Sequence, residues 1–287
     1  MESLRQSFLS PSTDTIDRCL RSVKKLAPKA LVRLSVFHDT NRDVSQMSTV
    51  ADVLVAFAPR RLVIDTLDIS EPSLTELVNE LRHGRGTGSV SRLSLLRNLS
   101  YSGNLDLPGH TLVNNTRQIR RLLKSARRLR SLRLSLDGIS YKGLLLPATA
   151  AILAANDFSR LTSFHLESAA VAGPELTAAL ARCGSSLLTV GLKDIWFVTN
   201  NRAWLSIFFI LSSMPRLSAA SFDGFFTDII SGRQLDFAGL IHGSNIHHDR
   251  IQYIGREQVT AGLGELVSAN LKARRRSPRL QMNRSLN

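Results

Sequence analysis

Apolar residues recur along the chain in a fixed pattern, apolar-x-x-apolar-x-apolar, in which the x positions are mostly polar. We identify seven copies, and their starting positions are separated by steps of 33, 32, 33, 32, 26 and 30 residues. The copies are Leu31/Leu34/Val36, Ile64/Leu67/Ile69, Leu96/Leu99/Tyr101, Leu129/Leu132/Leu134, Leu161/Phe164/Leu166, Leu187/Val190/Leu192 and Leu217/Ala220/Phe222. Because alternate residues of a strand point to opposite sides, each copy predicts a strand with one buried side.

Segments with a helical spacing of apolar residues lie between these strands. They cover residues 45–58, 72–83, 111–128, 147–156, 174–183 and 201–213. We expect Pro72, Pro147 and Pro174 in first helical turns, and Thr199 or Asn200 as the cap of the last helix. The repeated strand-helix unit predicts an α/β solenoid with a parallel concave sheet and convex helices.

The two ends of the chain differ from the repeats, as capping segments must if they shield the terminal core. Residues 13–26 predict an opening helix and residues 257–271 a closing one. The predicted organisation is an N-terminal capping region at 1–30, about seven irregular repeats at 31–226, a C-terminal cap at 227–271 and a basic, flexible tail at 272–287.

The segment LRNLSYSGN at 96–104 matches the consensus LxxLxLxxN, and the other copies match its apolar positions. Over about residues 31–225, the chain therefore resembles the leucine-rich-repeat portions of fungal F-box-like proteins. The residues before the first repeat are too few for a full F-box. The resemblance implies a horseshoe that selects substrates for a separate ubiquitin ligase, with a ligase adaptor as a further partner. At the asparagine position of the repeats stand Asn104, the partial substitutes Asp39 and Asp137, and the departures Pro72, Ala169, Ile195 and Phe225.

The polar side of the predicted sheet is the candidate binding surface. It combines small hydroxyl side chains with charges of both signs, which suits a protein partner better than a phosphate backbone. We expect binding residues at Arg33, Asp68, Ser100, Arg133, His165, Glu167, Lys193 and Asp223. The alternative from the same residues is a solvated sheet face that binds nothing.

The net charge of +14 comes from two short segments. Residues 117–133 and 272–287 hold 14 of the 37 lysines and arginines, which leaves 23 basic residues against 23 acidic ones elsewhere. The first segment predicts a helix with Ile119, Leu122, Leu123 and Ala126 buried. Its solvent side would carry Arg117, Arg120, Arg121, Lys124 and Arg128. The second hypothesis is thus a nucleic-acid-associated protein that uses this helix and the basic tail; a plain solvated face is the alternative.

The sequence predicts no catalytic residue, metal site or cofactor. His247, His248 and Asp249 predict a surface loop, since no second cluster completes a metal site. The glycine-rich segment 84–89 lacks the lysine of a phosphate-binding loop, and no GxSxG, HExxH or kinase motif occurs. We expect no enzyme; a divergent hydrolase is the remaining alternative.

Three further expectations concern the setting of the chain and its core. No apolar run reaches the roughly 20 residues of a membrane span, and no signal sequence is visible, so we expect a cytoplasmic or nuclear protein. Cys19 and Cys183 are expected to be reduced and buried. The aromatic residues Trp196, Phe197, Trp204, Phe208 and Phe209 are expected in the core.

Overall fold

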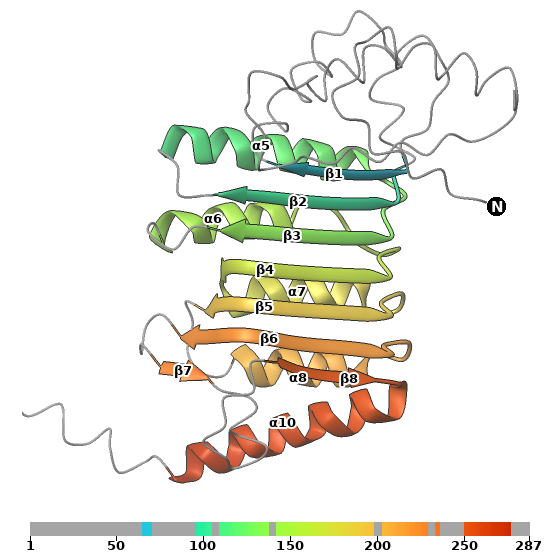
Figure 1. The fold of residues 1–287 in the computed structure, drawn as a ribbon, viewed down its shortest axis with the longest axis vertical. Coiled ribbons are helices and arrows are strands. Elements are labelled where there is room, and N and C mark those ends of the chain that lie inside the picture. The colour runs from blue at the N-terminus through green and yellow to red at the C-terminus, as the bar shows by residue number, and fades with distance from the viewer. Residues whose placement is uncertain are drawn as a thin grey trace, which may run out of the picture.

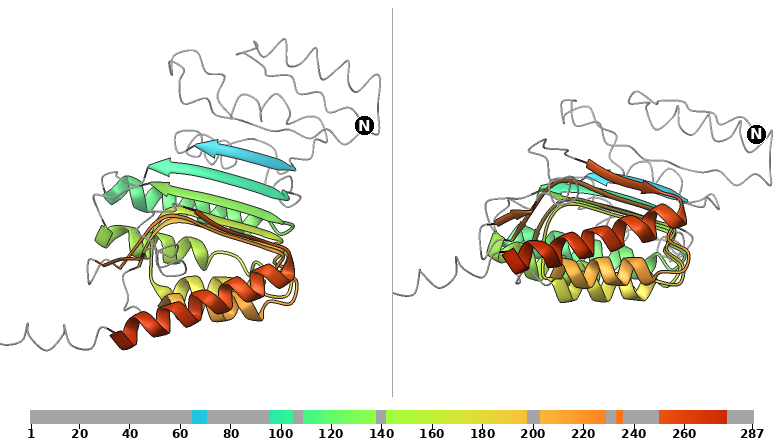
Figure 2. Two further views of the ribbon diagram at one scale, coloured as in Figure 1. Left: turned by 60° about the horizontal axis from the view of Figure 1, so that its bottom comes forward. Right: turned by 90° about the horizontal axis from the view of Figure 1, so that it is seen from below.

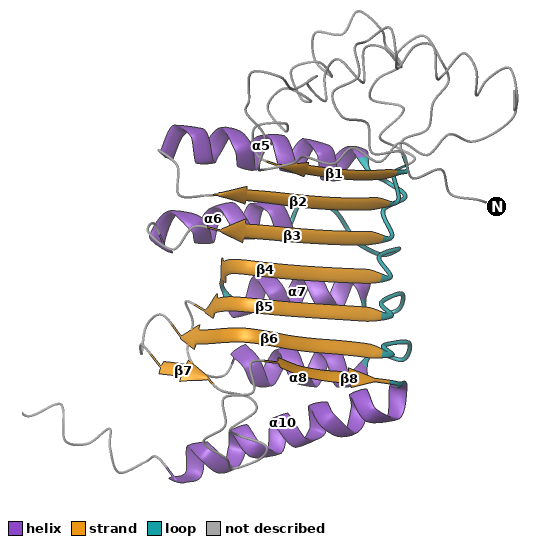
Figure 3. Cartoon of the chain, viewed as in Figure 1, coloured by secondary structure: helices purple, strands orange, loops and turns teal. Residues whose placement is uncertain are grey.

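The structure is a computed structural model that describes residues 65–70, 96–104, 109–137, 142–197, 203–228, 233–235 and 250–276 (Figure 1). Strands and helices alternate along most of this length (Figure 3). The strands are β1 Thr66–Ser70, β2 Asn98–Asn104, β3 Ser131–Asp137, β4 Ser163–Val171, β5 Thr189–Phe197, β6 Ala219–Asp228, β7 Arg233–Leu235 and β8 Arg250–Ile254. The helices are α5 Gly109–Ser125, α6 Lys142–Leu153, α7 Gly173–Cys183, α8 Ala203–Ser213 and α10 Arg256–Arg276.

The described strands form one eight-stranded, mostly parallel sheet. Strands β1 to β6 lie side by side in chain order and are all parallel, whereas β7 and β8 both pair antiparallel with β6. The described helices all lie on the same side of the sheet (Figure 2). The strand order does not reverse between β1 and β6, so this sheet lacks the crevice at which doubly wound α/β proteins bind ligands.

The spacing predicted from the sequence is confirmed for the described strands. Residues in register along the sheet are Thr66, Asn98, Ser131, Ser163, Thr189 and Ala219, separated by 32, 33, 32, 26 and 30 residues. A pattern of backbone hydrogen bonds also recurs at the strand starts: one carbonyl accepts from two successive N–H groups at the start of the next strand. The Arg130 carbonyl accepts from Thr162 N and Ser163 N at 2.7 and 2.9 Å, and the Leu188 carbonyl accepts from Ser218 N and Ala219 N at 2.9 and 3.0 Å.

A continuous apolar core fills the space between the sheet and the helices. Its members include the predicted inward positions of β1 to β6, and five aromatic rings extend it beneath β5 and β6. Trp204 lies at their centre, with ring centroids 4.4 Å from Phe197 and 4.9 Å from Phe226, both edge to face. Such contacts add about 0.5–1.5 kcal/mol each beyond the burial of apolar area.

Three local predictions need correction. Helix α6 begins at Lys142, so Pro147 lies inside the helix and not in its first turn. The apolar residues before the proline continue the helix, and a proline is compatible with helical φ at the loss of one hydrogen bond. Phe209 is 70% exposed, whereas its neighbour Phe208 is fully buried, because they lie about 100° apart around α8. Trp196 is only partly buried.

The C-terminal segment closes the core more elaborately than a single capping helix. Strand β8 pairs antiparallel along β6, and α10 packs beside α8. Val259, Leu263 and Leu266 of α10 are buried. Helix α10 continues to Arg276, so the first five residues of the predicted flexible tail are helical.

Several predictions fall outside the described residues. They concern the N-terminal cap at 1–30, the first strand with Arg33, the helices at 45–58 and 72–83, Cys19, the glycine-rich segment 84–89, Thr199, Asn200 and the segment His247–His248–Asp249.

Candidate interaction face

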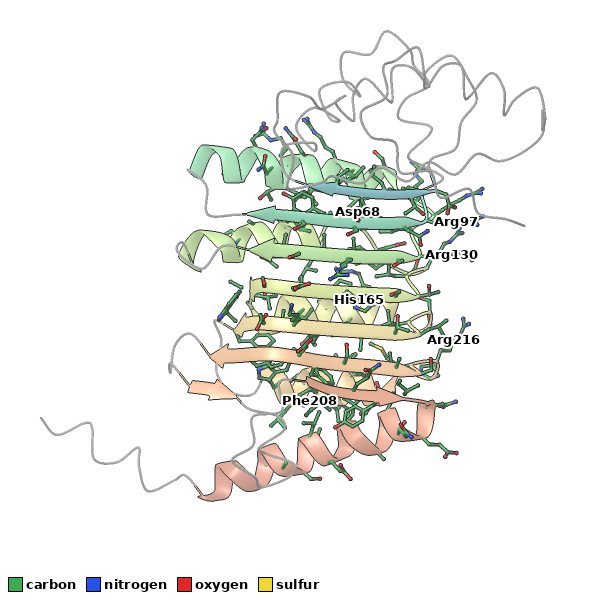
Figure 4. The ribbon with its side chains drawn as sticks, in the orientation of Figure 1. Asp68, Arg97, Arg130, His165, Phe208 and Arg216 are labelled. Carbon is green, nitrogen blue, oxygen red and sulfur yellow. The ribbon has the colours of Figure 1, made fainter. Side chains whose placement is uncertain are left out.

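The face of the sheet opposite the described helices, called the open face below, carries alternate residues of β1 to β6. The strand residues between them are buried beneath the helices. Because the parallel strands are in register, open-face residues form rows across the sheet. One row contains Asp68, Ser100, Arg133, His165, Gly191 and Ser221, and the next contains Ser102, Ser135, Glu167, Lys193 and Asp223. The structure thus brings together every predicted binding residue except Arg33, which it does not describe. Figure 4 labels Asp68 and His165 on this face.

Glu167 is the centre of an ion-pair network on this face. Its Oε1 accepts a hydrogen bond from Lys193 Nζ at 2.7 Å, and its Oε2 accepts one from Arg133 Nη2 at 3.1 Å. The Glu167 side chain is 19% exposed, against 62% for Arg133 and 45% for Lys193. The carboxylate is therefore held in place from both sides, while the two cations remain accessible to a partner.

The electrostatics of this network fix its charge state near neutral pH. Burial alone would raise the pKa of Glu167, but the hydrogen bonds and charges of Lys193 and Arg133 outweigh it and lower that pKa. The hydrogen bond to Glu167 and its charge raise the pKa of Lys193. Glu167 is thus ionised and Lys193 protonated, and Lys193 lies beside Asp223 in the same row. Charges of opposite sign alternate along the row.

His165 lies between the arginine and a glycine in its row. Burial, and next the positive charge of Arg133, lower its pKa from the usual 6.5, so the imidazole is neutral at pH 7. A Cβ placed on Gly191 would overlap the imidazole ring. The glycine therefore leaves the space in which the ring lies against the neighbouring strand.

A bend in three adjacent strands marks one boundary of the open face. Ser168 in β4, Asp194 in β5 and Gly224 in β6 have positive φ angles of 52°, 49° and 70°. The pairing of β5 with β6 shifts register there, as in a β-bulge. Beyond the bend the alternation is lost in β4, where residues 169–171 are all buried. Apart from Gly224, no residue pattern in the sequence marks this bend.

The basic helix lies on the opposite side of the molecule from the open face. Helix α5 buries Ile119, Leu122 and Leu123, and Ala126 follows it, also buried. The predicted solvent-facing residues Arg117, Arg120, Arg121, Lys124 and Arg128 are all exposed. The structure thus separates the basic helix from the predicted protein-binding residues by the thickness of the sheet and helix layers.

The described residues offer few groups suited to chemistry. Within them, no cluster of three or more histidine, cysteine or acidic residues could hold a metal ion. Burial raises the pKa of the Cys183 thiol to about 11, so it is protonated at pH 7 and a poor nucleophile. In the same part of the chain, no helix is both long enough and apolar enough to cross a membrane.

No family model matches this sequence, and a search of curated proteins finds no significant relative.

Proposed function

We propose that the chain is a non-catalytic interaction scaffold of the leucine-rich-repeat type, which binds a protein partner on its open face. The observation that carries this proposal is the ordered set of mixed charges around Glu167. Hydroxyl groups lie beside those charges: Ser100 separates Asp68 from Arg133, and Ser135 is the neighbour of Glu167 on β3. The in-order parallel strands with helices on one side also support a repeat solenoid, because such arrays present an extended sheet surface for binding.

The chemistry of the open face favours a protein over a phosphate backbone. Arg133 and Lys193 are both paired with Glu167, and Asp223 adds a further negative charge to the row. A polyanion would meet both signs of charge there, whereas a partner with its own acidic, basic and hydroxyl groups could complement each position. Arg133 is the strongest single anchor, since arginines are enriched among the residues that dominate binding energy.

The resemblance to fungal F-box-like proteins suggests a more specific role for such a scaffold. In that role the open face would select a substrate, and a separate ubiquitin ligase would modify it. This part of the proposal rests on the resemblance alone.

The test is affinity isolation of the tagged chain from its own cells, at low and at high salt and with and without nuclease, followed by protein identification. The open-face variant Arg133→Gln/Glu167→Gln loses one positive and one negative charge. The control Arg121→Gln/Glu265→Gln makes the same change at two exposed sites, one on α5 and one on α10. We expect a salt-resistant partner with the wild type and the control, and a roughly tenfold weaker recovery with the open-face variant.

Recovery of a ubiquitin-ligase adaptor with the same complex would support the substrate-selection role. A partner that both variants retain equally would place binding away from Glu167 and overturn the proposal. Loss of all partners with nuclease would overturn it as well.

A further inference from the structure

The edge of the sheet at which β3 to β6 begin, called the strand-start edge below, carries a row of exposed arginines. They come from turns that are far apart in sequence but adjacent in the fold. Figure 4 shows Arg130 and Arg216 along this edge, together with Arg97. Besides Arg97, the exposed members are Arg127, Arg128 and Arg130 before β3, Arg160 before β4 and Arg216 before β6.

These five guanidinium groups have no ion-pair partner within the described structure, nor any other polar contact. Two neighbouring arginines do have partners: Arg97 pairs with Asp65 at 3.4 Å, and Arg182 donates to the Leu153 carbonyl at 2.6 Å. The acidic side chain nearest in sequence to Arg160, Asp157, accepts from Ser159 N and Oγ at 3.1 Å. The edge therefore presents five arginines without an ion-pair partner in the described structure, against the carboxylate of Asp157, and it carries a net positive charge.

The kind of anion follows from the chemistry of these groups. All five are arginines, whose planar fork of donors matches the oxygens of a phosphate. The apolar residues in the same turns, among them Leu129, Phe158 and Leu217, are buried. The turns thus offer no exposed aromatic ring on which a base could stack, and their exposed apolar residues are only the small Ala154 and Pro215, which are poor anchors in a lipid layer.

The dimensions of the edge also suit an extended polyanion. Neighbouring strands are about 4.8 Å apart, so β3 to β6 span roughly 15 Å. A duplex carries one phosphate charge per about 1.7 Å of its axis, or roughly nine over that length. Several arginines could therefore contact phosphates of one duplex at once. A single small phosphate compound could engage only one or two of them.

We infer that the strand-start edge binds the phosphate backbone of a nucleic-acid duplex without reading its sequence. This surface is distinct from the open face, so the inference does not depend on the proposed protein partner. The exposed basic residues of α5 lead toward the same edge, because that helix ends just before Arg127 and Arg128.

The test measures binding of the full chain to a fluorescent, mixed-sequence DNA duplex by anisotropy at several salt concentrations. The edge variant is Arg128→Gln/Arg160→Gln/Arg216→Gln. The control, Arg274→Gln/Arg275→Gln/Arg276→Gln, removes the same charge at the end of α10, which lies at the opposite edge of the sheet (Figure 1). If all five edge arginines contact phosphates, the slope of log affinity against log salt is about −4.5 for the wild type and about −1.8 for the edge variant.

We expect the control to keep a slope close to that of the wild type. An equal loss in both variants would indicate attraction by net charge alone and would overturn the inference. So would binding to vesicles of phosphatidylcholine and phosphatidylserine with the same dependence on the edge arginines but no binding to the duplex. Thermal unfolding of the variants checks that the fold is intact, since all three substituted edge side chains are exposed.

Discussion

The contact between His165 and Gly191 gives a sharp test of the sheet register. The two residues are direct neighbours in β4 and β5. A Cβ on Gly191 would overlap the imidazole ring and lie 3.2 Å from Ser221 Oγ of β6. The φ angle of Gly191 is not in the left-handed region, so an alanine there meets a steric obstacle and no backbone strain.

Two opposing effects determine the result of Gly191→Ala. Alanine in a strand interior is favoured over glycine by about 0.5–1 kcal/mol, because it loses less backbone entropy on folding. The new methyl group, however, forces the imidazole out of its place, at about 1–3 kcal/mol for an overpacked site. We expect Gly191→Ala to lower the free energy of unfolding by about 1 kcal/mol in the wild type. In a His165→Ala background it should raise that free energy by about 0.5–1 kcal/mol.

The measurement is urea unfolding of the wild type, both single variants and the double variant. Circular dichroism follows the helices, and the four free energies give a coupling of about 1.5–2 kcal/mol between the two positions. Equal stabilisation by Gly191→Ala in both backgrounds would refute the reasoning, because the ring could not then lie against this glycine. A change in the slope m would instead indicate that a variant has altered the unfolded or native ensemble.

Three further predictions concern the core and the titrating groups. Phe208→Ala should destabilise the chain by about 3–5 kcal/mol and Phe209→Ala by less than about 0.5 kcal/mol, as measured by urea unfolding. Similar losses of stability in the two variants would contradict the orientation of α8. Because the pKa of His165 is lowered in the fold, the unfolded chain binds more protons below pH 6.5. The free energy of unfolding should therefore fall as the pH drops below that value, and His165→Gln should reduce this loss. Urea unfolding at a series of pH values below 6.5 measures it, and the same pH dependence in the wild type and the variant would refute the role of His165. In a Cys19→Ser variant, Cys183 should react with a maleimide at neutral pH only after unfolding; rapid labelling of the native chain would contradict its burial.

The repeat of the described strands could be predicted from the sequence because it rests on burial alone. A strand with one buried side must alternate apolar and polar residues, and each strand-helix unit must return to the same register. That alternation predicts which residues face away from the helices, so Asp68, Arg133 and Lys193 could be assigned to the open face from the sequence alone. Their partners could not, because the contact between Arg133 and Glu167 joins residues 34 positions apart, and no residue pattern marks it.

Other features were missed because they depend on contacts between distant segments. Strand β8 reads RIQYI, a short sequence that becomes a strand by pairing with the exposed edge of β6. On α5, Asn115 and Gln118 are buried beside the predicted apolar stripe, so the buried surface is wider than the apolar residues alone indicate. The bend at Ser168 and Asp194 uses residues that seldom adopt positive φ, and tertiary packing must stabilise it.

The basic run between residues 117 and 133 reads as a single patch in the sequence, but the fold divides it among three surfaces. Arg117 to Lys124 lie on the outer side of α5, and Arg127, Arg128 and Arg130 lie in the turn at the strand-start edge. Arg133 is only three residues further, yet it lies on the open face and pairs with Glu167, because alternation within β3 directs it there. Arg127, Arg128 and Arg130 thus have no ion-pair partner in the described structure, whereas Arg133 on the open face is paired with Glu167. This difference is why we assign a polyanion to one surface and a protein to the other.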